Sequence, residues 1–193
     1  MLREPHIAPL TDYVDDLRSC RGDESIPYFD PTEAGIGATI LVLLEAPGRK
    51  AAHGSGFVSA DNDDPTAENM WNFYRQAEID RSRDIVAWNV CPWYVGTPTK
   101  IRSVTRRDMK EAGPHVERLL GLLDDLRVVI LLGLKAQKAW GHLERATSAI
   151  AGRDIQVIKS WHPSPRGLAR YPHRAEEILE NLRRAGRHVQ QDK

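Results

Sequence analysis

The sequence predicts an α/β fold, a single three-layer αβα domain built on a mainly parallel, four-stranded central sheet. Two observations predict this class. Four short apolar segments alternate with longer segments whose apolar residues recur at helical spacing. Strands separated by helices of this length form βαβ units, in which the strands run parallel and helices cover both faces of the sheet. A chain of 193 residues, of which 41% are hydrophobic, is long enough for one core of ordinary size.

Each predicted strand is a short apolar run that ends near a turn former or a polar residue. The first stops before Pro47 and Gly48, and the second stops before Pro92. The predicted strands are Thr39–Leu44, Ile85–Val90, Arg127–Leu132 and Ile155–Ile158.

The predicted helices lie between and around these strands, and Asp64 or Thr66 is a candidate cap for the second of them. They are Pro9–Arg18, Pro65–Ala77, Asp108–Leu126, Lys135–Leu143 and Pro172–Ala185. We therefore expect one domain over residues 1–193, with a core at about 38–185 and an N-terminal helical extension over 1–37.

Composition excludes several classes of protein. Lys plus Arg and Asp plus Glu are both 27, so the formal net charge is zero, which excludes a polybasic tail but not a local basic face. The longest apolar runs, such as Ile40–Leu44, are too short to span a bilayer. Met1–Leu10 lacks the pattern of a secretion signal, so we expect a cytoplasmic protein, and we expect a monomer. The two cysteines, Cys20 and Cys91, are too few for a four-thiolate zinc or iron–sulfur site.

Unusual residues gather in the segments that follow the predicted strands. In a parallel α/β sheet, ligands bind at the carboxyl ends of the strands. The segments in question are Glu45–Phe57, Asn89–Gly96, Gly133–Lys135 and Trp161–Arg170. Their convergence predicts a functional site at this edge of the sheet.

Three polar residues stand out in these segments. Glu45 directly follows a buried strand, where a carboxylate serves a site or, in the simpler interpretation, lies on a surface turn. Asn89 offers both a donor and an acceptor, and it can recognise a ligand edge or merely cap the strand. His162 lies in a loop held by two prolines, which restrict its conformations.

Nucleophilic catalysis is a weaker interpretation. Ser164 follows His162 by two residues, but it is not in the Gly-x-Ser-x-Gly turn of the α/β-hydrolases. Cys91 has no adjacent cation in the sequence that would lower the pKa of its thiol, so a small buried apolar role is expected for it.

Taken in order, the motifs resemble those of the uracil-DNA glycosylase superfamily. Glu45-Ala46-Pro47-Gly48 is similar to the first motif, with Leu44 in place of its leading glycine, and His162-Pro163-Ser164-Pro165 is similar to the second. Between them, Gly56-Phe57-Val58 resembles the segment of the base-stacking aromatic, and Asn89-Val90 resembles the strand end of the base-recognising Asn. The resemblance covers about residues 38–185.

The resemblance implies a monofunctional, metal-free DNA glycosylase without a cofactor. Such an enzyme flips a damaged base, uracil first of all, out of the DNA and hydrolyses its N-glycosidic bond in base excision repair. Glu45 would position the attacking water and His162 would donate a hydrogen bond to the leaving base. Ala46, Phe57 and Asn89 would bind the base.

The same resemblance implies the contacts to DNA. Pro47, Gly48, Ser164, Pro165 and Arg166 would bind DNA, with Arg166 filling the space that the flipped base leaves. Two groups of basic residues flank these motifs and are candidates for phosphate contacts, although a solvated helix face explains the first equally well. They are Lys100, Arg102, Arg106, Arg107 and Lys110 and, beside His162, Arg166, Arg170, His173 and Arg174.

The chain departs from the family in two ways. Branches with the closest first motif carry four cysteines for an iron–sulfur cluster, so we expect no cluster here. The segment Ser59–Pro65 is acidic and replaces the usual Gly-Arg-Ala-Gly continuation after Phe57. The alternatives are therefore a member with altered specificity for hypoxanthine or xanthine, and a member that binds damage without cutting. A hydrolase of free nucleotides on the same sheet is a third. The expected partner in the leading interpretation is DNA with uracil or another deaminated base, in a bacterial-type cytoplasm where the enzyme acts on the nucleoid.

Overall fold

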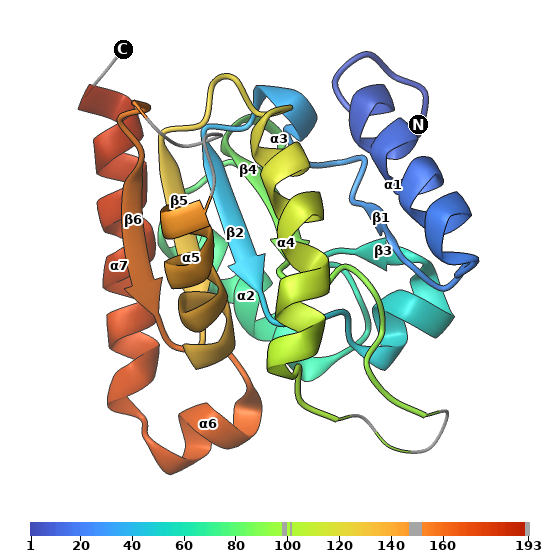
Figure 1. The fold of residues 1–193 in the computed structure, drawn as a ribbon. Coiled ribbons are helices and arrows are strands. Elements are labelled where there is room, and N and C mark those ends of the chain that lie inside the picture. Colours follow the sequence, from blue (N-terminus) through green and yellow to red (C-terminus); the bar gives the residue numbers. More distant parts are fainter. Residues whose placement is uncertain (98–99, 101, 147–151, 192–193) are drawn as a thin grey trace.

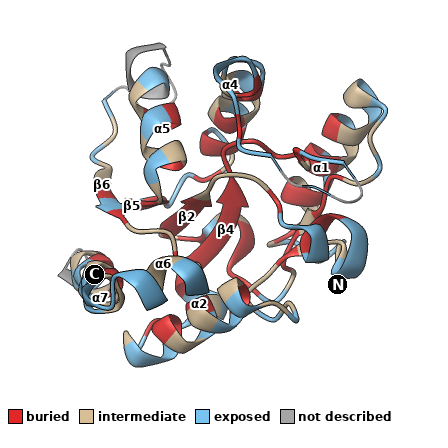
Figure 2. Cartoon of the chain, turned by 90° about the horizontal axis from the view of Figure 1, so that it is seen from below, coloured by how far each residue is buried: buried red, intermediate tan, exposed pale blue. Residues whose placement is uncertain are grey.

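The fold is a three-layer αβα sandwich, in which helices cover both faces of a parallel sheet. The computed structural model describes residues 1–97, 100, 102–146 and 152–191. Helices α1 (Ala8–Arg21), α4 (Arg106–Leu120) and α5 (Leu134–Ala146) lie on one side of the sheet. Helices α2 (Pro65–Gln76), α6 (Pro165–Arg170) and α7 (His173–Gln191) lie on the other (Figure 2). This arrangement confirms the predicted fold class.

The central sheet has four strands in the order β4-β2-β5-β6, all parallel. They are β2 (Ile40–Leu44), β4 (Ile85–Asn89), β5 (Val128–Leu132) and β6 (Gln156–Ser160). Each overlaps a predicted strand, and β6 extends two residues beyond the predicted Ile158. The carboxyl ends of all four strands therefore meet at one edge of the sheet, the lower edge in Figure 1.

Strands β2, β4 and β5 form where the sequence is almost continuously apolar, because both faces of the sheet are covered there. All five residues of β4 and all five of β5 are buried. The core extends from Ile7 to Val189 and includes a stack of Phe29 on Trp88, whose ring centroids are 3.7 Å apart. Tyr13 of α1 packs edge-on against the same Trp88, so the N-terminal segment contributes to this core. The division into a core and an N-terminal extension stays a prediction.

Capping residues define where the helices near the site begin. Asp64 caps α2 and accepts hydrogen bonds from the N–H groups of Thr66 and Ala67. Thr105 and Asp108 form a capping box that starts α4. α4 ends at Leu120 rather than at the predicted Leu126, because Gly121 follows it and the chain turns there. The last helix, α7, runs on to Gln191, beyond the predicted Ala185.

Several short features were not predicted, among them the 3-10 helix Gly35–Gly37 and the π-helical turn Ala51–Ser55. β1 (Tyr28–Phe29) and β3 (Phe57–Val58) form a separate two-stranded parallel sheet. The four-residue helix α3 (Arg81–Asp84) precedes β4. α6 begins within the segment Trp161–Arg170, for which a loop was predicted, because Ser164 caps a helix that has Pro165 in its first turn.

Candidate active site

A cavity of about 590 Å³ opens at the carboxyl ends of β2 and β4. We call it the carboxyl-end cavity. Its wall combines the turn after β2, the end of β4, the segment from Val58 to Tyr74, the loop before α4 and the residue two positions after β6. The polar side chains that line it are Glu33, Glu45, Arg49, Lys50, Ser59, Asn62, Asp64, Thr66, Tyr74, Asn89, Arg102, Ser103 and His162. The structure thus brings Glu45, Asn89 and His162 together, from three separate strand ends.

Glu45 is held in place by the backbone on both sides. Its carbonyl oxygen accepts a hydrogen bond from the Cys91 N–H at 3.0 Å, which continues the pairing of β2 with β4. Its side-chain Oε1 accepts a hydrogen bond from the Val104 N–H at 2.8 Å. The Val104 carbonyl in turn accepts a hydrogen bond from Lys135 Nζ at 2.9 Å. The carboxylate is therefore oriented before any ligand binds.

Asn89 is the last residue of β4 and is only 3% exposed. Within the described part of the chain, its side-chain amide has no hydrogen-bond partner. A buried amide of this kind normally has one. Its donor and acceptor are therefore available to a ligand in the carboxyl-end cavity, and the role of Asn89 in recognising a base edge stays a prediction.

His162 is placed by the strand that precedes it and by a neighbouring turn. The Gly133 N–H donates to the Ser160 carbonyl at 2.9 Å, which joins the ends of β5 and β6. Gly133 has φ +91°, and a Cβ there would lie 3.1 Å from His162 Cβ. Glycine adopts this left-handed φ without strain, and it has no Cβ to crowd His162. Burial lowers the pKa of His162 and the negative charges of Glu45 and Asp64 raise it, with burial the larger effect, so the neutral imidazole is favoured.

The second motif continues from His162 into α6. The Pro163 carbonyl accepts a hydrogen bond from Asn69 Nδ2 of α2 at 2.8 Å. Ser164 Oγ accepts a hydrogen bond from the Gly167 N–H at 3.3 Å, so this hydroxyl caps α6. Ser164, Pro165 and Arg166 lie beside the carboxyl-end cavity in sequence but are not part of its lining. A cap role for Ser164 does not favour the nucleophile interpretation.

The turn after β2 is part of the site, whereas the predicted aromatic is not. Ala46, Pro47 and Gly48 all line the carboxyl-end cavity. Phe57 does not: its ring lies beside that of Tyr28, with the centroids 6.4 Å apart, and its neighbour Val58 lines the cavity instead. The role of Phe57 in base stacking stays a prediction.

The acidic segment Ser59–Pro65 forms one wall of the carboxyl-end cavity. Its lining members are Ser59, Ala60, Asn62 and Asp64. None of these was among the predicted site residues. The pattern Asp64-Pro65-Thr66 indicated a helix start, but it did not indicate that the helix begins at the site.

Glu33 is a further lining residue that the sequence did not reveal. It is 2% exposed, and its Oε2 accepts a hydrogen bond from the Ala87 N–H at 2.8 Å. Its Oε1 lies 4.0 Å from Nε of Arg81, which also binds Asp30 and Asp61. The Arg81 guanidinium is thus shared by three carboxylates. Burial is the main cause that raises the pKa of Glu33 to about 8, and the charge of Asp30 adds to it.

The basic residues near the site differ in how far they are neutralised. Arg102 forms a two-point hydrogen bond with Asp108, at 2.6 and 2.9 Å. Arg174 stacks on the rings of Trp161 and Tyr171, at 3.9 and 4.0 Å from their centroids. The remaining side chains of the two predicted groups are exposed, and they are Lys100, Arg106, Arg107, Lys110, Arg166, Arg170 and His173.

The cysteines do not fit an iron–sulfur cluster. Cys20 is exposed on α1, and Cys91 is buried after β4, where its thiol donates to the Trp93 carbonyl at 3.7 Å. Burial raises the pKa of the Cys91 thiol to about 12, which agrees with a packing role. Among the described residues, no group of three or more His, Cys, Asp or Glu is arranged to hold a metal ion. None of the described helices is both long and apolar enough to cross a membrane.

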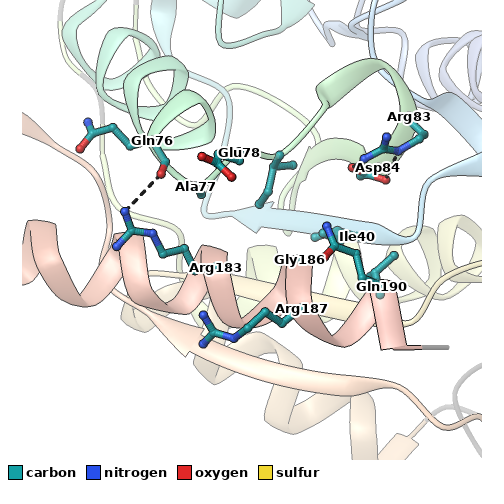
Figure 3. Close-up of a pocket in the computed structure, with 12 residues that line it drawn as sticks. Ile40, Gln76, Ala77, Glu78, Arg83, Asp84, Arg183, Gly186, Arg187 and Gln190 are labelled. Atoms are coloured by element: carbon teal, nitrogen blue, oxygen red, sulfur yellow. Dashed lines mark hydrogen bonds and ion pairs between the residues drawn. The ribbon is translucent and has the colours of Figure 1, made fainter. Parts of the chain in front are cut away.

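A second hollow lies at the other end of the sheet, where β2 begins. This amino-end pocket has a volume of about 320 Å³ and is lined by residues of α2, α3 and α7 together with Ile40. Figure 3 shows three arginines around it, and two of them are engaged with residues of the same pocket: Arg83 with Asp84 and Arg183 with the Gln76 carbonyl. It holds neither of the two predicted motifs.

Comparisons with known proteins identify a family for the chain. A sequence model of the Uracil DNA glycosylase superfamily matches residues 31–183. Among solved structures, the chain is similar to a solution NMR structure of a candidate uracil DNA glycosylase from Methanosarcina acetivorans. The identity is 14% and the TM-score is 0.47, over 78% of this chain and 92% of that chain. No curated protein matches the chain.

Proposed function

The chain belongs to the uracil DNA glycosylase superfamily, and we propose that it is a monofunctional DNA glycosylase that flips a damaged base into the carboxyl-end cavity. Uracil is the leading candidate base. The observation that carries the proposal is the meeting of Glu45, Asn89 and His162, three residues from separate strand ends, in one cavity with unused hydrogen-bonding capacity.

Each of the three residues suits one part of the reaction. The C1′–N bond breaks with its electron pair on the leaving base, and the sugar becomes oxocarbenium-like. A neutral His162 donates a hydrogen bond to a carbonyl oxygen of the base as negative charge develops there. Glu45 orients the water that adds to C1′ and accepts its proton, while the departing base anion takes up a proton from solvent. Asn89 pairs with the acceptor and donor on the edge of the base.

The surroundings suit a polyanionic substrate. Exposed basic side chains at the start of α4 and on α6 flank the carboxyl-end cavity, and phosphate contacts of this kind supply most of the affinity for DNA. Arg166, on the exposed side of α6, is the candidate for filling the space of the flipped base. The expectations of a monomer and of a cytoplasmic location stay predictions.

The test is an excision assay on oligonucleotides that carry one uracil, in single and double strands, with a chelator present. We expect cleavage at uracil by the wild-type protein and a loss of at least about 100-fold, on the order of what one oxyanion donor contributes, in His162→Ala. Tight binding to the damaged strand without cleavage of any base would instead identify a damage-binding protein.

One observation favours an altered base specificity as the second candidate. The acidic segment Ser59–Pro65 lines the carboxyl-end cavity where the family has a different sequence after the aromatic, so the shape and charge of the wall differ. Hypoxanthine and xanthine in the same assay test this candidate. Faster release of either base than of uracil would establish it.

A further inference from the structure

Tyr74 of α2 is a buried tyrosine whose hydroxyl has no hydrogen-bond partner among the described residues. The residue is 2% exposed and lines the carboxyl-end cavity. Its oxygen is not one of the fully covered side-chain atoms that lack a partner, so part of its surface is open. The hydroxyl therefore opens onto the cavity that Tyr74 lines.

A second buried tyrosine shows how such a hydroxyl is satisfied elsewhere in the molecule. Tyr13 of α1 is fully buried, and its hydroxyl donates to the His115 carbonyl at 3.1 Å. A buried hydroxyl without such a bond costs free energy, because it has lost its hydrogen bonds to water. Packing alone needs only an apolar ring, as at the neighbouring Phe73. The unused hydroxyl of Tyr74 therefore indicates a ligand in addition to packing.

The position of Tyr74 on α2 directs its side chain along the cavity. Ala67, Met70 and Tyr74 follow one another at the spacing of a single helix face, and all three line the cavity. Asn69, in the first half of α2, donates to the Pro163 carbonyl at 2.8 Å, so the helix starts at the carboxyl ends of the strands. Long side chains on a helix lean toward its start. The Tyr74 hydroxyl is thus directed back toward the carboxyl ends.

The buried polar side chains of the cavity lining are Glu33, Tyr74 and Asn89. Glu33 Oε2 already accepts the Ala87 N–H at 2.8 Å, whereas the other two side chains have no partner among the described residues. Burial raises the pKa of Tyr74 well above its ordinary value, so the hydroxyl keeps its proton and can donate. A ligand in the cavity thus meets one amide and one hydroxyl that are both unsatisfied.

We propose that Tyr74 is a base-binding residue, whose hydroxyl donates a hydrogen bond to the carbonyl oxygen of the flipped base that also accepts from the Asn89 amide. A carbonyl oxygen has two lone pairs, so it accepts from both donors at once. Uracil, hypoxanthine and xanthine each carry such an oxygen beside a ring N–H, which pairs with the amide oxygen of Asn89. The inference rests on the proposed function, because it takes the ligand of the cavity to be a base.

Tyr74→Phe removes the hydroxyl and keeps the ring. Tyr13→Phe is the matched control, since it removes a hydroxyl that is equally buried but bonded and outside the cavity. We expect the melting temperature to fall in Tyr13→Phe, which leaves the His115 carbonyl without its partner, and to stay unchanged or rise in Tyr74→Phe. A fall in Tyr74→Phe as large as that in Tyr13→Phe would show a structural role for the hydroxyl and contradict the proposal.

The affinity for the base is measured by NMR titration of each protein with free uracil and with free hypoxanthine. We expect Tyr74→Phe to bind the base about tenfold more weakly than the wild type, as for the loss of one hydrogen bond, and Tyr13→Phe to bind it with unchanged affinity. Equal affinities of Tyr74→Phe and the wild type for both bases would overturn the proposal. So would a wild-type protein that binds neither base.

The excision assay separates this inference from the proposed function. We expect Tyr74→Phe to excise uracil about tenfold more slowly than the wild type at a DNA concentration below saturation. Equal rates would refute the role of Tyr74 and leave the proposed function standing. A wild-type protein that binds the free base but excises none would refute the glycosylase activity, whereas the affinities would still decide the role of Tyr74.

Discussion

The two hollows at opposite ends of the sheet differ in how their polar groups are satisfied. In the amino-end pocket, Arg83 binds Asp84 at 2.7 Å and Arg183 donates to the Gln76 carbonyl at 3.3 Å (Figure 3). In the carboxyl-end cavity, the Asn89 amide and one oxygen each of Glu45 and Asp64 have no partner among the described residues. This difference in hydrogen bonding shows that a hollow by itself does not indicate a ligand-binding site. Polar groups that are held in place but left unsatisfied do, because they retain the capacity to bind a ligand.

The largest expected difference between the two regions is in catalysis. Glu45→Gln should lower the excision rate by about 10²- to 10³-fold, because an amide cannot accept the proton of the attacking water. Glu78→Gln, which changes a carboxylate of the amino-end pocket, should leave the rate within about twofold. Single-turnover kinetics on a uracil-containing strand measure both. Equal losses of the excision rate in the two variants would show that the carboxyl-end cavity is not the active site.

The next effect is a dependence of stability on pH that Glu33 imposes. The pKa of this acid is about 8 in the folded chain against its ordinary 4.5, so the folded state holds the proton more tightly than the unfolded state does. Its contribution to stability is complete below pH 4.5 and is lost as the pH rises through about 8. Relative to Glu33→Gln, which stays neutral, the wild-type protein should lose about 2–4 kcal/mol of unfolding free energy over this range.

Denaturant unfolding at a series of pH values checks this second prediction. In Glu33→Gln, the side-chain amide oxygen can still accept the Ala87 N–H, so the variant tests the charge rather than the hydrogen bond. Parallel stability curves for the two proteins would show that Glu33 is ionised throughout and paired with Arg81.

A smaller effect comes from one glycine at each end. Gly133→Ala should destabilise the fold by about 1–3 kcal/mol, since alanine would be strained at φ +91° and its Cβ would lie 3.1 Å from His162 Cβ. Gly186→Ala, in α7 beside the amino-end pocket, should stabilise the fold by about 0.5–1 kcal/mol. Its Cβ would meet Ile79 at an ordinary 3.7 Å. Thermal melting measures whether each variant is less or more stable than the wild-type protein. A Gly133→Ala variant that melts at a higher temperature than the wild type would contradict the predicted strain.

The smallest expected effect concerns DNA affinity. Arg166→Ala should weaken binding and reduce the slope of log affinity against log salt by about one unit, as expected when one phosphate contact is lost. Arg183→Ala should change neither, because its guanidinium faces the amino-end pocket and donates to the Gln76 carbonyl. Binding titrations from low to moderate salt measure the slopes. An unchanged slope in Arg166→Ala would remove α6 from the DNA interface.

The regular part of the fold was predictable because its determinants are local. Continuous apolar runs such as Val128–Leu132 require cover on both faces of a sheet, and this requirement alone favours parallel strands with helices around them. The order of the strand ends then placed Glu45, Asn89 and His162 at one edge. The topology alone was therefore enough to predict that these three residues lie close together, without information on other contacts between distant segments.

The missed parts depend on contacts between distant segments. The two-residue strands β1 and β3 have no periodicity of their own and exist by pairing with each other. That pairing sets the Phe57 ring beside Tyr28. Glu33 lies in a stretch without regular structure, and it is buried through contacts with the edge of β4 and with Arg81, which are distant in the sequence. The helix α6 was hidden because two prolines suggested a rigid loop, although Pro165 occupies a first-turn position that proline favours.

The same Glu33 has a consequence for how the protein behaves at high concentration. β4 is an edge strand, and an open edge offers its backbone to a strand of another molecule, which leads to aggregation. Here the Ala87 N–H on that edge is bonded to the Glu33 carboxylate, and the Ile85 carbonyl accepts from the Ala34 N–H at 2.9 Å. A short segment of the chain's own N-terminal part thus occupies bonds that an intermolecular β-ladder would need, and the protein shields the β4 edge of its sheet without adding a fifth strand.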